Sequence, residues 1–123
     1  MTYEIDLMHP GHKAWTVTRE ELPAAYADLK EGNSPSVTWG DISDGGVVIV
    51  QVADDYSVVT LGVDDTFYWL QTADDDEPVT VEIGGTDGEV PRGALVPREL
   101  GLEVLLRVDN LAALRTDYMW VEQ

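Results

Sequence analysis

The sequence predicts an α+β fold, in which a single antiparallel β-sheet with meander order is flanked by two helices. Three observations favour this class: short segments rich in β-forming residues, acidic turns of a few residues between them, and two stretches with helical periodicity. Connections this short predict antiparallel hairpins, because parallel strands need crossovers of a dozen or more residues. We expect one domain over residues 1–123, since a chain of this length with 44% hydrophobic residues can bury its own core.

The first third of the chain predicts a hairpin followed by a helix. Apolar and polar residues alternate over residues 3–7 and again over residues 15–17, with a Pro-Gly turn signal between the two segments. Thr18 and Glu21 then have the spacing of a capping box, in which each side chain binds a free amide at the start of a helix. We therefore expect a helix over residues 18–30.

The middle of the chain predicts five further strands, separated by acidic turns. The expected strands are residues 36–39, 47–53, 57–63, 67–72 and 79–83. The glycine-rich residues 84–88 that follow predict a flexible loop.

The last third predicts a second helix and a final strand. Pro97 is a favourable first helical residue, and the helix is expected over residues 97–111. The residues expected to face the sheet are Leu100, Val104, Leu105, Val108 and Leu111. Leu102 and Leu106 fall outside this face, so they either contact a second element or form an exposed patch. Alternation over residues 118–122 predicts a last strand that returns to the sheet.

The composition is strongly acidic, because 24 Asp and Glu residues against 7 Lys and Arg residues result in a formal charge of −17. Such a chain repels phosphates, so we expect no direct binding of nucleic acid. The absence of cysteine excludes disulfides, a thiolate nucleophile and Cys-ligated zinc. The first residues lack a signal-peptide pattern, and the longest aliphatic run, residues 47–50, is too short to cross a bilayer. We expect a cytoplasmic protein that binds no membrane.

No motif in the chain predicts catalysis, a cofactor or a metal. His9 and His12 flank a Pro-Gly turn and their spacing identifies no third ligand, so a polar hairpin turn explains them better than a metal site. The acidic runs lack the order of calcium ligands in an EF-hand, and the serines lack a G-x-S-x-G context. The alternative of an enzyme with a pocket around the two histidines stays open.

Acidic residues are concentrated in the predicted turns, with aromatic residues beside them. Two interpretations stay open: solvated turns that keep the chain soluble, or a surface that steers the chain onto a basic partner and uses Trp and Tyr as anchors. Alternate turns of a meander fall at the same end, so residues 54–55 and 74–77 are expected to share one rim, and residues 41–44 and 64–65 the other. The candidate partner-binding residues are Asp54, Asp55, Tyr56, Asp64, Asp65, Tyr68, Trp69, Asp74, Asp75, Asp76, Glu77 and Trp39.

A set of segments in the second half of the chain resembles a known family. Residues 58–69, residues 79–85, the proline-containing residues 89–97, an amphipathic helix and a terminal strand ending in Trp120 are similar to the Imm1 family of bacterial immunity proteins. The resemblance covers about residues 36–122. It implies an antidote to a polymorphic toxin, often a nucleic-acid deaminase, which the immunity protein binds and blocks without catalytic residues of its own.

The charge and the resemblance together predict a basic toxin domain as the partner. Carboxylates placed where substrate phosphates would bind could occupy a basic groove, and the inhibition would then be stoichiometric. A monomer is expected before complex formation, because like-charged copies repel each other. The alternative within the binding class is an acidic adaptor or nucleic-acid mimic that acts on another basic protein.

Overall fold

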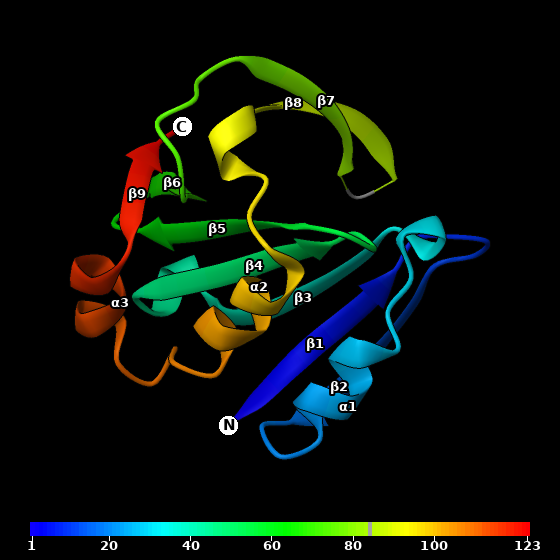
Figure 1. Ribbon diagram of the computed structural model, residues 1–123. Coiled ribbons are helices and arrows are strands. Elements are labelled where there is room, and N and C mark those ends of the chain that lie inside the picture. The colour runs from blue at the N-terminus through cyan, green and yellow to red at the C-terminus, as the bar shows by residue number, and fades with distance from the viewer. Residues whose placement is uncertain (84) are drawn as a thin grey trace.

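The computed structural model describes residues 1–83 and 85–123, and its main element is a seven-stranded antiparallel sheet (Figure 1). The strand order is β2-β1-β3-β4-β5-β6-β9. The strands are β1 Thr2–Leu7, β2 Lys13–Thr18, β3 Pro35–Asp41, β4 Gly46–Val52, β5 Ser57–Val63, β6 Thr66–Gln71 and β9 Met119–Glu122. The strands from β3 to β6 form the predicted meander, and the α+β class is confirmed.

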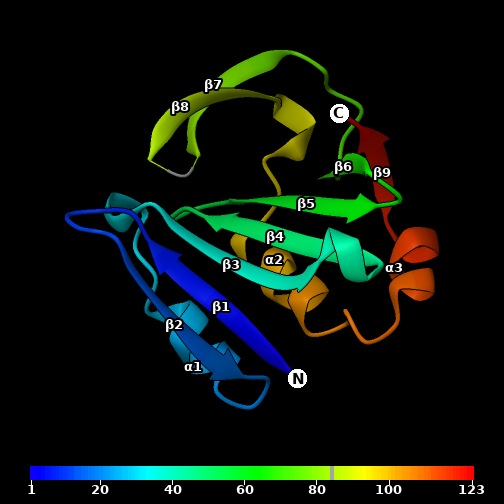
Figure 2. The ribbon, with the colours of Figure 1, turned by 180° about the vertical axis from the view of Figure 1, so that it is seen from behind.

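Helices cover one face of this sheet. The α-helices among the described residues are α1 Leu22–Ala27, α2 Arg98–Leu105 and α3 Leu111–Asp117, and the 3₁₀ helices are η1 Glu31–Asn33, η2 Ile42–Asp44 and η3 Arg92–Ala94. Both α1 and α2 lie in front of the sheet in Figure 1 and behind it in Figure 2. The main core lies between these layers, where Leu22, Leu105 and Leu114 pack against strand residues such as Val50 and Val59. No helix of the described residues is both long enough and apolar enough to cross a membrane.

A two-stranded sheet of β7 Pro78–Ile83 and β8 Thr86–Pro91 arches over the main sheet (Figure 1). Val58 packs in a second core cluster with Val81 and Val90, whereas its neighbour Val59 belongs to the main core. Because successive strand residues face opposite sides of a sheet, the β7–β8 hairpin packs on the face opposite the helices, against β5 and β6.

The prediction of one sheet is therefore wrong for residues 79–83. Val81 of β7 is buried, and Val79 and Ile83 are partly buried, by packing across the face of β5. The edge position beside β6 is taken by β9. The flexible loop predicted over residues 84–88 is also corrected, because β8 begins at Thr86; Gly84 lies outside the described residues. Alternation of apolar residues specifies a strand with one buried face but does not specify its partner.

The prediction of a helix over residues 97–111 is corrected to two helices. The first, α2, ends at Leu105, and the Asn110 side chain accepts a hydrogen bond of 3.0 Å from the Ala113 amide. This cap starts α3, since an asparagine at the N-cap satisfies a free amide of the first turn. Leu102 and Leu106 are half-buried and pack against the main core, so they form no separate exposed patch.

Close packing of α2 on the sheet explains a glycine inside this helix. A Cβ atom on Gly101 would lie 2.7 Å from the Tyr26 hydroxyl and 2.8 Å from both Ser57 Oγ and Val50 Cγ1. Glycine is unfavourable in a helix interior, but here it lets the backbone of α2 approach β4, β5 and α1.

The first predicted helix is present but shorter than expected. Thr18 and Glu21 make both hydrogen bonds of the predicted capping box, with the Thr18 amide 2.9 Å from Glu21 Oε1 and the Glu21 amide 3.2 Å from Thr18 Oγ1. These bonds lie in the turn just before the helix, whose N-cap is Glu21. The helix itself, α1, extends only from Leu22 to Ala27. Leu22 and Tyr26 are buried in the main core, which is what anchors this short element.

Arg98, at the start of α2, hydrogen-bonds to backbone carbonyls in α1, in the segment just after α1 and in the β4–β5 turn. Its Nη1 donates to the Ala53 carbonyl at 2.8 Å, and its Nη2 donates to the carbonyls of Tyr26 and Leu29 at 2.8 Å each. The guanidinium also lies 5.4 Å from the centre of the Tyr26 ring, and the Tyr26 hydroxyl donates to the Arg98 carbonyl at 2.6 Å. The carbonyls at the end of α1 therefore have a charged donor in place of a further helical turn.

Because the Tyr26 hydroxyl is buried, we expect the protein to lose stability at alkaline pH. Burial raises its pKa to about 12, whereas an unfolded tyrosine ionises near pH 10. Its contribution to stability is thus complete below pH 10 and is lost as the pH rises toward 12, because only the unfolded state releases the proton in this window. Between about pH 9 and about pH 11, the urea midpoint of the Tyr26→Phe variant should fall less than that of the wild type. If the urea midpoints of the two proteins fall equally, a group other than Tyr26 causes the loss of stability at alkaline pH.

Candidate partner-binding site

The acidic turns predicted from the sequence are exposed at both ends of the sheet. Asp54 and Asp55 lie in the β4–β5 turn, and Asp64 and Asp65 lie in the β5–β6 turn at the opposite end. The latter two have φ angles of 53° and 63°, the left-handed backbone that a tight two-residue hairpin turn requires. These four carboxylates therefore belong to two separate surfaces.

The acidic segment of residues 74–77 follows β6 and is tied to η3. The Gly93 amide donates to the Asp75 carbonyl at 2.8 Å, and Arg92 Nη atoms lie 3.4 Å from Asp75 Oδ2 and 3.5 Å from Glu77 Oε1. Just after η3, the Val96 amide donates to the Ser57 carbonyl at 3.0 Å. Hence η3 runs between residues 74–77 and β5, and Arg92 offsets part of the charge of that segment.

The four candidate aromatic residues lie in three different environments. Trp39 is half-buried and packs against the main core on the helix side, and Trp69 packs against the second core under the β7–β8 hairpin. Tyr68 lines a shallow depression together with Arg115 and Trp120. Tyr56 alone of the four directly follows an acidic turn, and it is half-buried at the edge of the second core.

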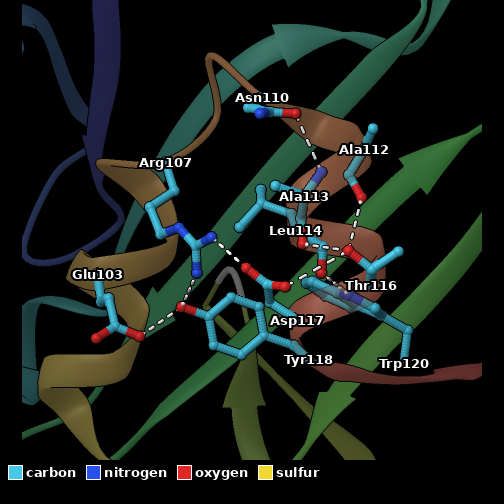
Figure 3. A network of polar contacts seen from close by, with 10 residues as sticks. All are labelled: Glu103, Arg107, Asn110, Ala112, Ala113, Leu114, Thr116, Asp117, Tyr118 and Trp120. Carbon is cyan, nitrogen blue, oxygen red and sulfur yellow. Dashed lines mark hydrogen bonds and ion pairs between the residues drawn. The ribbon is translucent and has the colours of Figure 1, made fainter.

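The wall of the Tyr68 depression is held by a polar network between α2, α3 and β9 (Figure 3). Arg107 donates to Asp117 and, at 3.0 Å, to the Tyr118 hydroxyl, which in turn donates to Glu103. Trp120 Nε1 donates to the Leu114 carbonyl at 2.8 Å. The bonding of Tyr118 and Trp120 within the fold gives these two side chains a structural role.

A small cavity opens beside Tyr56, between η1, the β4–β5 turn and β7. Its volume is about 60 Å³. We call it the acidic slot and define it by its polar lining residues, which are Glu31, Ser34, Gln51, Tyr56 and Glu82. The floor is apolar, because Val52, Val58 and Val81 also line it and are buried.

Hydrogen bonds join the mouth of the acidic slot to the β4–β5 turn. The Glu31 amide donates to Asp54 Oδ1 at 2.9 Å, and the Asp54 amide donates to Glu31 Oε1 at 3.2 Å. Burial and the nearby Glu31 carboxylate raise the pKa of the Tyr56 hydroxyl, which keeps that group neutral. Glu31, Asp54, Asp55 and Glu82 thus place negative charge around one half-buried tyrosine.

Sequence reasoning identified Asp54, Asp55 and Tyr56 but missed Glu31 and Glu82. The missed residues come from η1 and from β7, which lie far from the β4–β5 turn along the chain. Only the return of the β7–β8 hairpin over β5 brings Glu82 to this place. A local sequence pattern contains no signal for that juxtaposition.

The two histidines contact different carboxylates. His9 Nε2 lies 3.4 Å from Glu82 Oε1, and His12 Nε2 lies 2.8 Å from Asp6 Oδ1. Over residues 1–83 and 85–123, no group of three His, Cys, Asp or Glu side chains is placed to hold a metal ion.

Comparisons with protein-family models, with curated proteins and with solved structures found no match for this chain.

The site assignment therefore depends on the surface itself. The β4–β5 turn combines exposed carboxylates, a half-buried tyrosine and a cavity within a few residues of one another. A surface of this kind attracts cationic groups by its charge and offers an aromatic side chain for contact. We take this turn, with the acidic slot, as the candidate partner-binding site.

Proposed function

We propose that this protein is a cytoplasmic immunity protein, which binds a cognate bacterial toxin domain and inhibits it stoichiometrically. The observation that carries the proposal is the cluster of carboxylates around Tyr56 at the β4–β5 turn, on a chain of formal charge −17. The similarity of residues 36–122 to the Imm1 family supports the same function. The partner is a basic domain, and nucleic-acid deaminases are the toxin class that the resemblance favours.

Inhibition in this proposal needs no reaction on the immunity protein. Toxins that act on nucleic acids bind phosphates with basic residues, and carboxylates of the β4–β5 turn compete for those residues. The same charges raise the association rate and disfavour acidic partners more than they add affinity. The half-buried Tyr56 then contributes desolvated contact area at the centre of the interface.

The proposal is tested by capture and titration. The tagged protein is purified from its native cells, the retained proteins are identified by mass spectrometry, and the activity of the retained domain is measured against increasing amounts of purified protein. We expect a basic domain whose activity falls to zero near a molar ratio of one. A bound basic protein whose activity is indifferent to the titration would instead support the acidic adaptor.

A further inference from the structure

We propose that the acidic slot receives the side chain of a single lysine from the basic partner. The inference depends on the proposed function only in that it assigns the lysine to a protein partner. The slot is a built cavity with an apolar floor and polar walls, and it lies directly beside the exposed carboxylates of the β4–β5 turn.

The negative charge of the slot favours a cation as its ligand. Two glutamates, Glu31 and Glu82, belong to the lining, and none of its described lining residues is a lysine or an arginine. The Glu31 contact to the Asp54 amide uses Oε1, which leaves Oε2 as an acceptor for a further donor. Glu82 has His9 at 3.4 Å, and this contact is an ion pair only when His9 is protonated. An incoming cation would therefore meet uncompensated negative charge.

The small size of the slot favours lysine over arginine. The slot is small, with a volume of about 60 Å³. The ammonium group of lysine is a compact charge on a flexible stem, whereas a guanidinium is a larger rigid plane of one carbon and three nitrogens. The apolar floor formed by Val52, Val58 and Val81 suits the methylene stem.

The slot also offers the acceptors that an ammonium group needs. Lysine has three N–H donors, and burying a charge is unfavourable unless these are paired. The lining includes Glu31 and Glu82, whose carboxylates are acceptors, and Ser34 and Gln51, whose side chains each have an acceptor oxygen. The Ser34 hydroxyl already accepts from the Gly85 amide at 3.1 Å and has a second lone pair. Tyr56 belongs to the lining as well, and an aromatic ring attracts a cation placed over its face.

The test uses the full ¹⁵N-labelled chain and short peptides, and it needs no toxin. The probes are acetyl-Gly-Lys-Gly-amide, the same peptide with arginine, and the same peptide with an acetylated lysine. We expect saturable shifts of the Ser34, Gln51, Tyr56 and Val81 resonances with the lysine peptide only. The affinity should fall by about tenfold in the double variant Glu31→Gln, Glu82→Gln, because each glutamine keeps its shape but loses its charge.

A matched control is the double variant Asp64→Asn, Asp65→Asn in the β5–β6 turn. It removes the same charge at the other end of the sheet, and asparagine tolerates the left-handed backbone there. This control should bind the lysine peptide as the wild type does. The inference is overturned by equal binding of the acetylated peptide, by equal binding of the arginine peptide, by an equal loss in the control, or by no saturable shift. If the glutamine variant does not fold, the affinities of the three peptides for the wild type are sufficient to support or overturn the inference.

The slot and the proposed function can fail separately. Binding of the lysine peptide without any captured toxin would support the slot and count against the immunity function. A captured toxin silenced at a molar ratio near one, without binding of the lysine peptide, would support the function and overturn the slot.

Discussion

Replacing Arg98 by alanine is expected to lower the free energy of unfolding by about 3 kcal/mol and the melting temperature by roughly 10 °C. The variant loses three hydrogen bonds of 2.8 Å from a guanidinium to the carbonyls of Tyr26, Leu29 and Ala53. These bonds join α1, the β4–β5 turn and α2, so their loss affects the packing of both helices on the sheet. Urea or thermal unfolding followed by circular dichroism measures the effect.

Two further variants make this result specific. Arg98→Lys should lie between the wild type and the alanine variant, because an ammonium group keeps the charge but cannot reach all three carbonyls as a planar guanidinium does. Lys13→Ala removes an exposed cation from the edge strand β2 and should change stability by less than about 0.5 kcal/mol. An unchanged unfolding midpoint for Arg98→Ala would show that the three hydrogen bonds make no net contribution to the free energy of unfolding.

Reversing the charge of Asp55 to lysine is expected to slow association with the captured partner by about 10-fold at low salt. The Asp55 side chain is exposed, and among the described residues it makes no side-chain hydrogen bond or ion pair, so the fold should be unaffected. The expected loss is in the association rate, because exposed charges steer the encounter more than they hold the complex. Surface plasmon resonance at several salt concentrations separates the two rates.

The matched control for this prediction is Asp44→Lys, because Asp44 is exposed and lies outside the candidate site. It changes the net charge equally, so any slowing that both variants share reports the overall charge, and only the excess in the Asp55 variant reports the site. The excess should shrink as salt rises, since screening shortens the range of exposed charges. Equal slowing by both variants would contradict the placement of the interface at the β4–β5 turn.

Much of the local structure follows from the sequence alone. Alternating residues predicted β1, and the apolar runs with short acidic turns predicted the meander of β3 to β6. The capping box of Thr18 and Glu21 is present with both of its hydrogen bonds. These features depend on neighbours within a few residues, so a local pattern contains the information needed to predict them.

The helix boundaries show where local patterns were misread. Asn110 is a good N-cap residue three positions before Ala113, and this signal could have divided the predicted helix over residues 97–111. The short length of α1 could not be predicted from a local pattern. It ends at Ala27, where Arg98, from far along the chain, bonds the carbonyls of Tyr26 and Leu29.

The sequence by itself determined the acidic character of the chain, the meander and the contiguous group of Asp54, Asp55 and Tyr56. Only the tertiary structure decided that β7 and β8 form their own sheet and that β9 pairs with β6. It also decided that Glu31 and Glu82 join Tyr56 in the acidic slot. The physical reason is that hydrophobic burial is non-directional. An apolar strand face has to be buried, but its own residues do not specify which element buries it. Only the packing of the whole folded chain selects that element.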